Sequence, residues 1–311
     1  MKDRIKVKGG FITKNQHRDN IVFCVQTPWK DKYFDIMKKH NATTLRLTGL
    51  SGRSKSDYDF LATLPKWITG IQINSDYIRD TRMLGNLPWI KELYLSLAPK
   101  PIYPDFSRFA NLEIAMLDSW TKEAETLRDT NSLKLFFCTS YPYEDLEPLN
   151  NWTNLRYLKL HRSRKLKSLT GIEKLKNLRA IEFYSLSQLT DISRFADCPI
   201  LKIIDIESCK KIGCLPEFKI GNKLRFLAFD NCNEIESLEP IMNCQNLTNL
   251  FFGVTKILDG KIKIIDKLKN LQSVGLQNRK FYDYTREELH AWHLRIGSIP
   301  FNELFDQLVW D

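Results

Sequence analysis

Apolar residues recur along this chain at a fixed interval of 23 residues. The repeated segments begin at Leu155, Leu178, Leu201, Leu224 and Leu247. Each of them starts with the pattern L-x-x-(apolar)-x-(apolar). The first four also carry apolar residues at offsets 11, 14 and 17 from their first leucine. Such self-similarity predicts a stack of structural repeats in place of a single globular core.

Each segment predicts one short strand with one apolar face, because apolar and polar residues alternate after the opening leucine. A segment of this length cannot cover that face alone. If the segments stack and their strands pair in parallel, the apolar positions form one continuous core. The opening pattern continues with less regular spacing upstream to Ala42 and downstream to Leu271. It therefore predicts about eleven strands.

In these positions the sequence resembles the short bacterial leucine-rich repeats of internalin-like proteins. The ninth motif position, normally Asn or Cys in that family, is Cys209 and Cys232 in two repeats and Ser163, Leu186 or Thr255 in others. The resemblance implies an α/β repeat solenoid, a curved leucine-rich repeat horseshoe with a parallel concave β-sheet of about eleven strands and a cap at each end. Because the asparagine ladder of the family is mostly missing, other hydrogen bonds must hold its turns.

Residues 1–41 lie before the repeats and predict an N-terminal cap. Ile5 to Ile12 reads as a hairpin turning at Gly9-Gly10, and residues 21–25 read as a further strand. A helix is predicted to begin at Thr27-Pro28, with threonine as its N-cap. We expect this cap to cover the open edge of the first repeat.

The repeat solenoid is predicted over residues 42–282, and residues 283–311 predict a helical C-terminal cap. Thr285 and Glu288 have the spacing of a capping box for a first helix that stops at Gly297. A second short helix is predicted from about Pro300, because apolar residues follow at helical spacing, at Phe301, Leu304, Phe305 and Leu308.

Composition bounds the location of the protein. The chain has a formal net charge of +10. Its seven cysteines include no C-x-x-C pair, and this use of cysteine favours a reducing compartment. No stretch approaches the roughly 20 apolar residues that cross a bilayer. Residues 1–10 are charged and lack the apolar core of a secretory signal. We therefore expect a cytoplasmic protein without a membrane association that is monomeric when free.

Side chains at motif positions 3, 5 and 7 are expected on the concave face, because side chains alternate along a strand. Many are large and apolar, although the exposed face of a sheet is normally polar, and protein interfaces use such side chains as anchors. The alternative is that they only pack against one another across strands. The predicted partner-binding residues are Tyr94, Met116, Phe137, Tyr157, Lys159, His161, Glu182, Tyr184, Asp205, Glu207, Phe226, Asp230 and Phe251.

The charged residues at these positions predict the sign of the partner's charge. Carboxylates fall together on three adjacent predicted strands, at Glu182, Asp205, Glu207 and Asp230. An acidic patch in a concavity attracts a basic ligand and speeds its capture. The alternative is a solvated face with scattered charge.

The sequence contains no G-x-S-x-G, Walker A, G-x-G-x-x-G or H-E-x-x-H motif, so no catalytic residue and no cofactor is predicted. Cys209 with Cys214 lacks recognisable ligand spacing for a metal site. His290 and His293 are close enough on the predicted helix to suggest a metal site, but no third ligand lies nearby, which favours packing of the cap or plain exposure. No metal is predicted, and we do not expect an enzyme.

The leading hypothesis is a non-catalytic protein-binding module that captures a basic protein on its concave aromatic and acidic face. One version is a bacterial immunity-like protein that neutralises a cationic toxin. The alternative is nucleic-acid or scaffold binding through the basic outer surface and the caps. Nucleic acid is the weaker of these because concave carboxylates repel phosphate.

Overall fold

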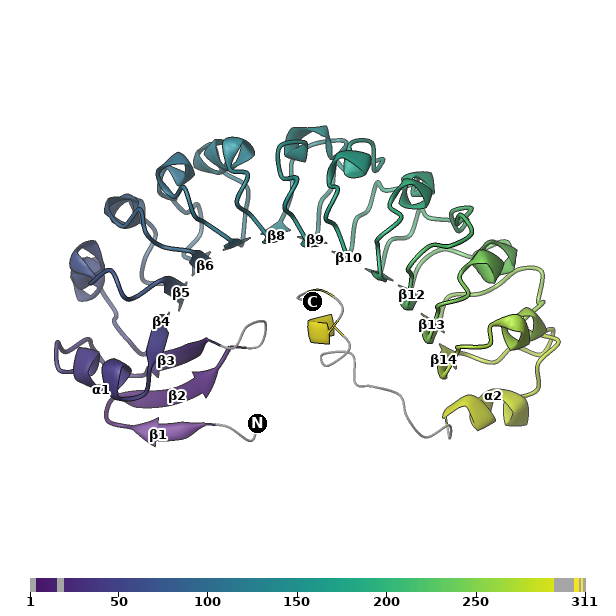
Figure 1. The fold of residues 1–311 in the computed structure, drawn as a ribbon, viewed down its shortest axis with the longest axis horizontal. Coiled ribbons are helices and arrows are strands. Elements are labelled where there is room, and N and C mark those ends of the chain that lie inside the picture. Colours follow the sequence, from purple (N-terminus) through teal and green to yellow (C-terminus); the bar gives the residue numbers. More distant parts are fainter. Residues whose placement is uncertain (1–3, 16–19, 294–304, 308, 310–311) are drawn as a thin grey trace. The chain divides into compact units, whose positions relative to one another are not determined.

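The computed structural model describes residues 4–15, 20–293, 305–307 and 309 of the chain. The chain forms two compact units, Met1–Cys138 and Thr139–Asp311. In each unit, short parallel strands lie on one side of the core and short helices lie on the other (Figure 1). This is the α/β repeat solenoid that the sequence predicts.

The first unit opens with a capping hairpin and one further strand. β1 (Ile5–Val7) pairs antiparallel with β2 (Gly10–Lys14), and β2 pairs antiparallel with β3 (Ile21–Val25). β3 then pairs in parallel with β4 (Ala42–Thr48), the first repeat strand. The predicted hairpin and strand are confirmed, and they supply backbone partners to an edge that would otherwise be open.

The repeats of the first unit continue in sequence order, each strand parallel to its predecessor. Their strands are β5 (Gly70–Ser75), β6 (Glu92–Leu97), β7 (Ile114–Leu117) and β8 (Leu135–Thr139). The 3-10 helices opposite the sheet are η1 (Lys55–Thr63), η2 (Arg82–Asn86), η3 (Phe106–Arg108) and η4 (Glu123–Asp129).

The second unit repeats this arrangement with the same parallel order. Its strands are β9 (Tyr157–His161), β10 (Ala180–Tyr184), β11 (Ile203–Glu207), β12 (Phe226–Asp230), β13 (Asn249–Gly253) and β14 (Ser273–Leu276). Its 3-10 helices are η5 (Glu147–Leu149), η6 (Ile172–Lys174), η7 (Ser193–Asp197), η8 (Glu239–Asn243) and η9 (Lys263–Lys267). Among the described residues the eleven strands β4 to β14 coincide with the eleven predicted openings.

The predicted apolar columns form the core. In the repeat that begins at Leu155, the strand residues Leu158 and Leu160 are fully buried, as are Leu166 and Leu169 across the core. Burying a leucine side chain stabilises a fold by about 1.5–3 kcal/mol. Because the same positions recur in the following repeats, each repeat completes the core of its neighbour.

The ninth motif position shows what replaces the missing asparagine ladder. The Leu186 amide donates to Cys209 Sγ at 3.4 Å, and the Cys232 amide donates to Thr255 Oγ1 at 3.0 Å. Both bonds join one repeat to the next. Cysteine and threonine therefore accept backbone hydrogen bonds at this position.

The first helix differs from its prediction. α1 spans Tyr33–Lys39 and does not begin at Thr27. The Thr27 hydroxyl is paired with the Tyr33 hydroxyl at 2.7 Å, while Trp29 stacks on Phe60 of η1 with ring centroids 4.3 Å apart. The residues before α1 are thus held by aromatic packing against the first repeat, which overrides the local capping pattern.

The C-terminal residues occupy two places. α2 (Arg286–His293) begins with the predicted capping box, because the Thr285 amide donates to Glu288 and the Glu288 amide donates to Thr285 Oγ1. Gly297 lies outside the described residues, as does most of the second predicted helix. Phe305 is helical and lies against Tyr157 of β9. The predicted limits of solenoid and caps stay a prediction.

Two glycines with left-handed backbone test how closely the repeats pack. Gly171 has φ +97°, and a Cβ there would lie 2.5 Å from the backbone nitrogen of Glu147, whereas Gly221 has φ +81° and open space around it. We expect Gly171→Ala to lower the unfolding free energy by about 2–4 kcal/mol, and Gly221→Ala by only the conformational cost of about 1–2 kcal/mol. Urea denaturation measures both, and equal losses would contradict the close packing.

Candidate binding surface

In each unit the predicted site residues lie on the face of the sheet that points away from the core, here named the open face. In the second unit, strand register places them in rows. Lys159 pairs with Glu182 and Glu182 with Asp205, while Tyr184 pairs with Glu207. The predicted acidic residues therefore do come together, on β10, β11 and β12.

Side chains at motif position 3 are buried, although the sequence placed them on an exposed face. Tyr157 is 3% exposed and Phe226 is 6% exposed. The Phe305 ring covers Tyr157, with centroids 4.6 Å apart, and the Phe251 ring lies 5.5 Å from that of Phe226. In this structure these two predicted anchors are already covered by side chains of the same chain.

Glu182 is the centre of a charged cluster. Lys159 Nζ forms an ion pair with its carboxylate, the Tyr157 hydroxyl donates to it at 2.6 Å, and His161 Nε2 lies 3.7 Å away. Burial acts to raise the pKa of Glu182, but the neighbouring His161, Lys159 and Tyr157 lower it to about 2. The carboxylate is therefore ionised and satisfied within the chain.

Asp205 has the opposite environment. Burial is the main cause that raises its pKa to about 7, and the charges of Glu182 and Glu207 raise it further. Near neutral pH this carboxyl is divided between its protonated and ionised forms. It contributes only part of a negative charge to the open face.

Asp230 serves the backbone of the next repeat. Its Oδ1 accepts a hydrogen bond from the Val254 amide at 3.0 Å, just after β13. Glu207 is the exposed carboxylate of the four. The acidic patch is therefore weaker as a binding feature than the sequence indicates, because Glu182 and Asp230 have partners and Asp205 is partly neutral.

Three predicted anchors lie on the open face of the first unit. Tyr94 pairs with Met116, and Met116 pairs with Phe137, so these side chains are direct neighbours across β6, β7 and β8. Each is half-buried. They form an apolar row that keeps part of its surface exposed.

A polar network beside this row escaped the sequence analysis. Glu92 is 4% exposed and accepts hydrogen bonds from Asn15 at 3.1 Å, Asn20 at 3.0 Å and the Gln72 side chain. A buried carboxylate requires such donors. The signal was present, because Glu92 is the one carboxylate at motif position 3 in the sequence.

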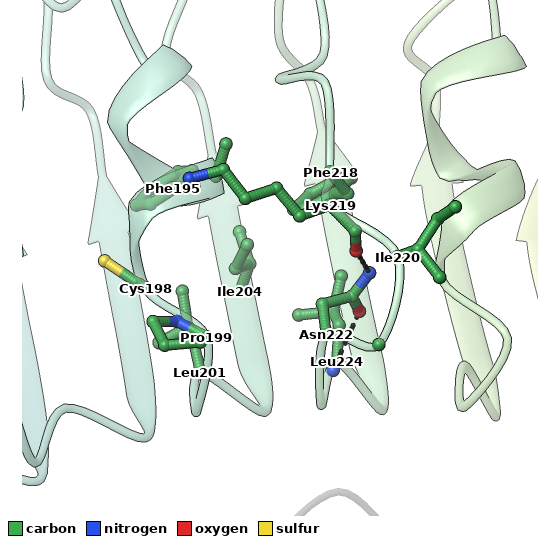
Figure 2. A pocket seen from close by; sticks show the side chains of 12 residues that line it. Phe195, Cys198, Pro199, Leu201, Ile204, Phe218, Lys219, Ile220, Asn222 and Leu224 are labelled. Atoms are coloured by element: carbon green, nitrogen blue, oxygen red, sulfur yellow. Dashed lines mark hydrogen bonds between the residues drawn. The ribbon is translucent and has the colours of Figure 1, made fainter.

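A small cavity of about 150 Å³ lies in the second unit, on the core side of the sheet (Figure 2). It is lined by apolar side chains that include Phe195, Ile204, Phe218 and Leu224. In the repeat beside it, the described residues between β11 and β12 form no 3-10 helix. Asn222 donates to the Lys219 carbonyl at 2.7 Å and closes the turn. The lining of the cavity also includes Cys198 and Lys219.

Within the described ranges, no group of three His, Cys, Asp or Glu side chains is arranged to hold a metal ion. No helix among those residues has the length and apolar character to cross a membrane.

The raised pKa of Asp205 predicts a specific pH dependence. An unfolded aspartate ionises near pH 3.9, so between about pH 4 and pH 7 the folded chain binds more protons at this residue, and its contribution to stability falls as pH rises. Asp205→Asn should therefore gain stability relative to the wild type between pH 4.5 and pH 8, by more than about 1 kcal/mol. Denaturation at both pH values measures this difference. Glu217→Gln, at an exposed residue outside the cluster, serves as the control.

Comparisons with known proteins concern the fold. No protein-family model matches the sequence. The disease resistance protein RPP2A of Arabidopsis thaliana is 25% identical over 142 residues, which are 44% of this chain and 11% of that protein.

An internalin from Listeria monocytogenes has a similar structure, with a TM-score of 0.50 and 20% identity over 77% of this chain and 74% of the internalin. A chain of the Drosophila complex of Toll and Spatzle has a TM-score of 0.49 and 14% identity, over 88% of this chain and 47% of that chain. The 23-residue repeat, its parallel strands and the likeness to the internalin structure show that the chain has a leucine-rich repeat fold.

Proposed function

We propose that this chain is a non-catalytic protein-binding module that uses the open face of its sheets. The observation that carries the proposal is the set of large side chains that stay half-exposed there, namely Tyr94, Met116 and Phe137 in the first unit and Tyr184 and Phe251 in the second. Aromatic residues and methionine on a preformed surface are the anchors that protein interfaces favour.

The rigidity of the sheet supports this proposal. Tyr184 sits on β10, whose five residues pair with both neighbouring strands, so the backbone that carries it has no free edge. Its ring also packs against His161, with centroids 5.4 Å apart. A side chain fixed in this way loses little conformational entropy when a partner binds.

The finer proposal is a basic protein partner, in one version a cationic bacterial toxin that the chain neutralises. It is supported by the exposed carboxylate of Glu207 beside Asp205 and Tyr184. The pairing of Glu182 with Lys159 weakens it. Nucleic-acid or scaffold binding through the basic outer surface remains the alternative, supported by the net charge of +10.

The proposed surface predicts where a partner cross-links. A photoreactive residue at Tyr184 identifies the partner in cells that make this protein. With the purified partner, Tyr184→Ala combined with Phe251→Ala should weaken binding by about tenfold or more, because aromatic anchors contribute about 2 kcal/mol or more each. Isothermal titration measures the affinity. Ile220→Ser, at an 87% exposed residue away from the open face, is the control, and an equal loss there would contradict the proposal.

The substitution Glu207→Lys tests the sign of the partner's charge. A basic partner should then bind more slowly and about five- to tenfold more weakly at low salt, because an exposed charge acts through long-range attraction. Stopped-flow association rates measure the effect. Glu217→Lys makes the same change of charge at another exposed residue. Faster association of the Glu207→Lys variant would instead identify an acidic partner.

A further inference from the structure

Two described C-terminal residues contact the second unit on its open face, Phe305 through Tyr157 and Val309 through Arg179. Phe305 is 4% exposed and Val309 is fully buried, whereas Asp306 and Gln307 between them are exposed. Residues four apart lie on one face of a helix. This segment therefore packs on the sheet as an amphipathic helix does.

The apolar contact is specific in its geometry. The Phe305 ring meets the Tyr157 ring at an interplanar angle of 71°, an edge-to-face arrangement. Such aromatic pairs contribute attraction beyond the area they bury. Tyr157 is held in turn by the hydrogen bond from its hydroxyl to Glu182. The sheet thus presents a fixed aromatic platform to whatever lies on it.

A row of basic residues borders this platform. Each repeat of the second unit from β9 to β12 carries Lys or Arg at motif position 2, just before the strand, at Arg156, Arg179, Lys202 and Arg225. Backbone hydrogen bonds join each of these residues to the next, at 2.7–2.9 Å. We name these four residues the basic row.

One member of the basic row contacts a described residue near the C-terminus. Arg179 Nη1 donates to the Val309 carbonyl at 3.4 Å. The last twelve residues, 300–311, include Glu303, Asp306 and Asp311 and contain no Lys, Arg or His. Their charge is therefore opposite to that of the row.

We infer that the open face of the second unit is a site for an acidic amphipathic helix, and that the C-terminal segment of this chain is its resident occupant. The inference rests on the proposed protein-binding function and, for the surface around Tyr157, replaces the basic partner by an acidic one. That partner is a helix with an aromatic and an aliphatic residue four apart and carboxylates nearby. Such a helix in another protein must displace the C-terminal segment, whose local concentration is high because it is tethered.

The chemistry of the surface supports an acidic helix over a basic one at this place. Lys159 neutralises Glu182, so the carboxylate nearest Tyr157 offers no free charge to a basic ligand. The four residues of the basic row are partly exposed. Arginine also suits the helix C-terminus, where backbone carbonyls lack partners within the helix, as the Val309 carbonyl shows.

The test uses the full chain with Phe305→Ser and Val309→Ser, and a fluorescent peptide with the sequence of residues 299–311. The peptide should bind this variant at least about tenfold more tightly than the wild type, because the wild-type site is occupied. Gln307→Ser, at an exposed residue of the same segment, should behave as the wild type. Fluorescence anisotropy measures binding, and equal affinity for the three proteins overturns the inference.

The basic row is tested in the same background. Arg179→Gln with Lys202→Gln should weaken peptide binding by about tenfold and reduce its salt dependence. Lys219→Gln, which removes an exposed charge paired with Asp197, is the matched control. Equal effects of these changes would show that the row does not recognise the helix, and would overturn the inference.

A second measurement on the wild type distinguishes a variant that fails to fold from one that fails to bind. If the Phe305 and Val309 variant does not fold, excess unlabelled peptide is added to the wild type and amide exchange of residues 305–309 is measured. Displacement should speed that exchange several-fold, and unchanged exchange overturns the inference. The proposed function fails by a different result, a partner whose binding ignores Tyr184 and Phe251.

Discussion

The structure depends on one constraint, which is that no repeat can bury its own apolar face. Leu158 and Leu160 are fully buried because the neighbouring repeats place the same kinds of residue beside them. The interval of 23 residues keeps these positions in register, and register in turn aligns the outward side chains into rows. A surface ordered in this way is a consequence of core packing, before any partner is considered.

The same periodicity explains how much the sequence could predict. The strands and the core follow from a local pattern, so all eleven openings coincide with strands in the described part of the chain. The repeat interval also indicates that Lys159 lies beside Glu182, because the two residues are 23 positions apart and pair across β9 and β10. Lys159 and Glu182 were both predicted as partner-binding residues but were not predicted to pair with each other, although this pairing decides whether Glu182 is available to a partner.

Other features depend on contacts that no periodic pattern contains. The start of α1 is set by Trp29 on Phe60, and these two residues are separated in the sequence by α1, β4 and a loop. The burial of Tyr157 is set by Phe305, near the end of the chain. Motif position gives the direction of a side chain but does not give what covers it. This is why the direction of Tyr157 was predicted and its burial was not.

In both units the open face is engaged by residues from outside the repeats. In the first unit, Asn15 and Asn20 donate to the buried carboxylate of Glu92. In the second, Phe305 covers Tyr157 and Val309 accepts from Arg179. The two contacts differ in a way that bears on function. A buried carboxylate that loses its donors incurs a large desolvation cost, so the first contact is expected to persist.

Between the described residues, the second contact includes an edge-to-face ring pair and a long hydrogen bond at a partly exposed arginine. Another helix with an aromatic ring, an aliphatic residue and a free carbonyl end satisfies the same groups, so displacement leaves no buried polar atom without a partner. Exchange of one occupant for another is therefore energetically feasible on the second unit, where the Tyr157 ring would otherwise be exposed to water. On this reasoning the part of the open face around Tyr157 is covered whichever helix is bound, and binding at that place is a competition between helices.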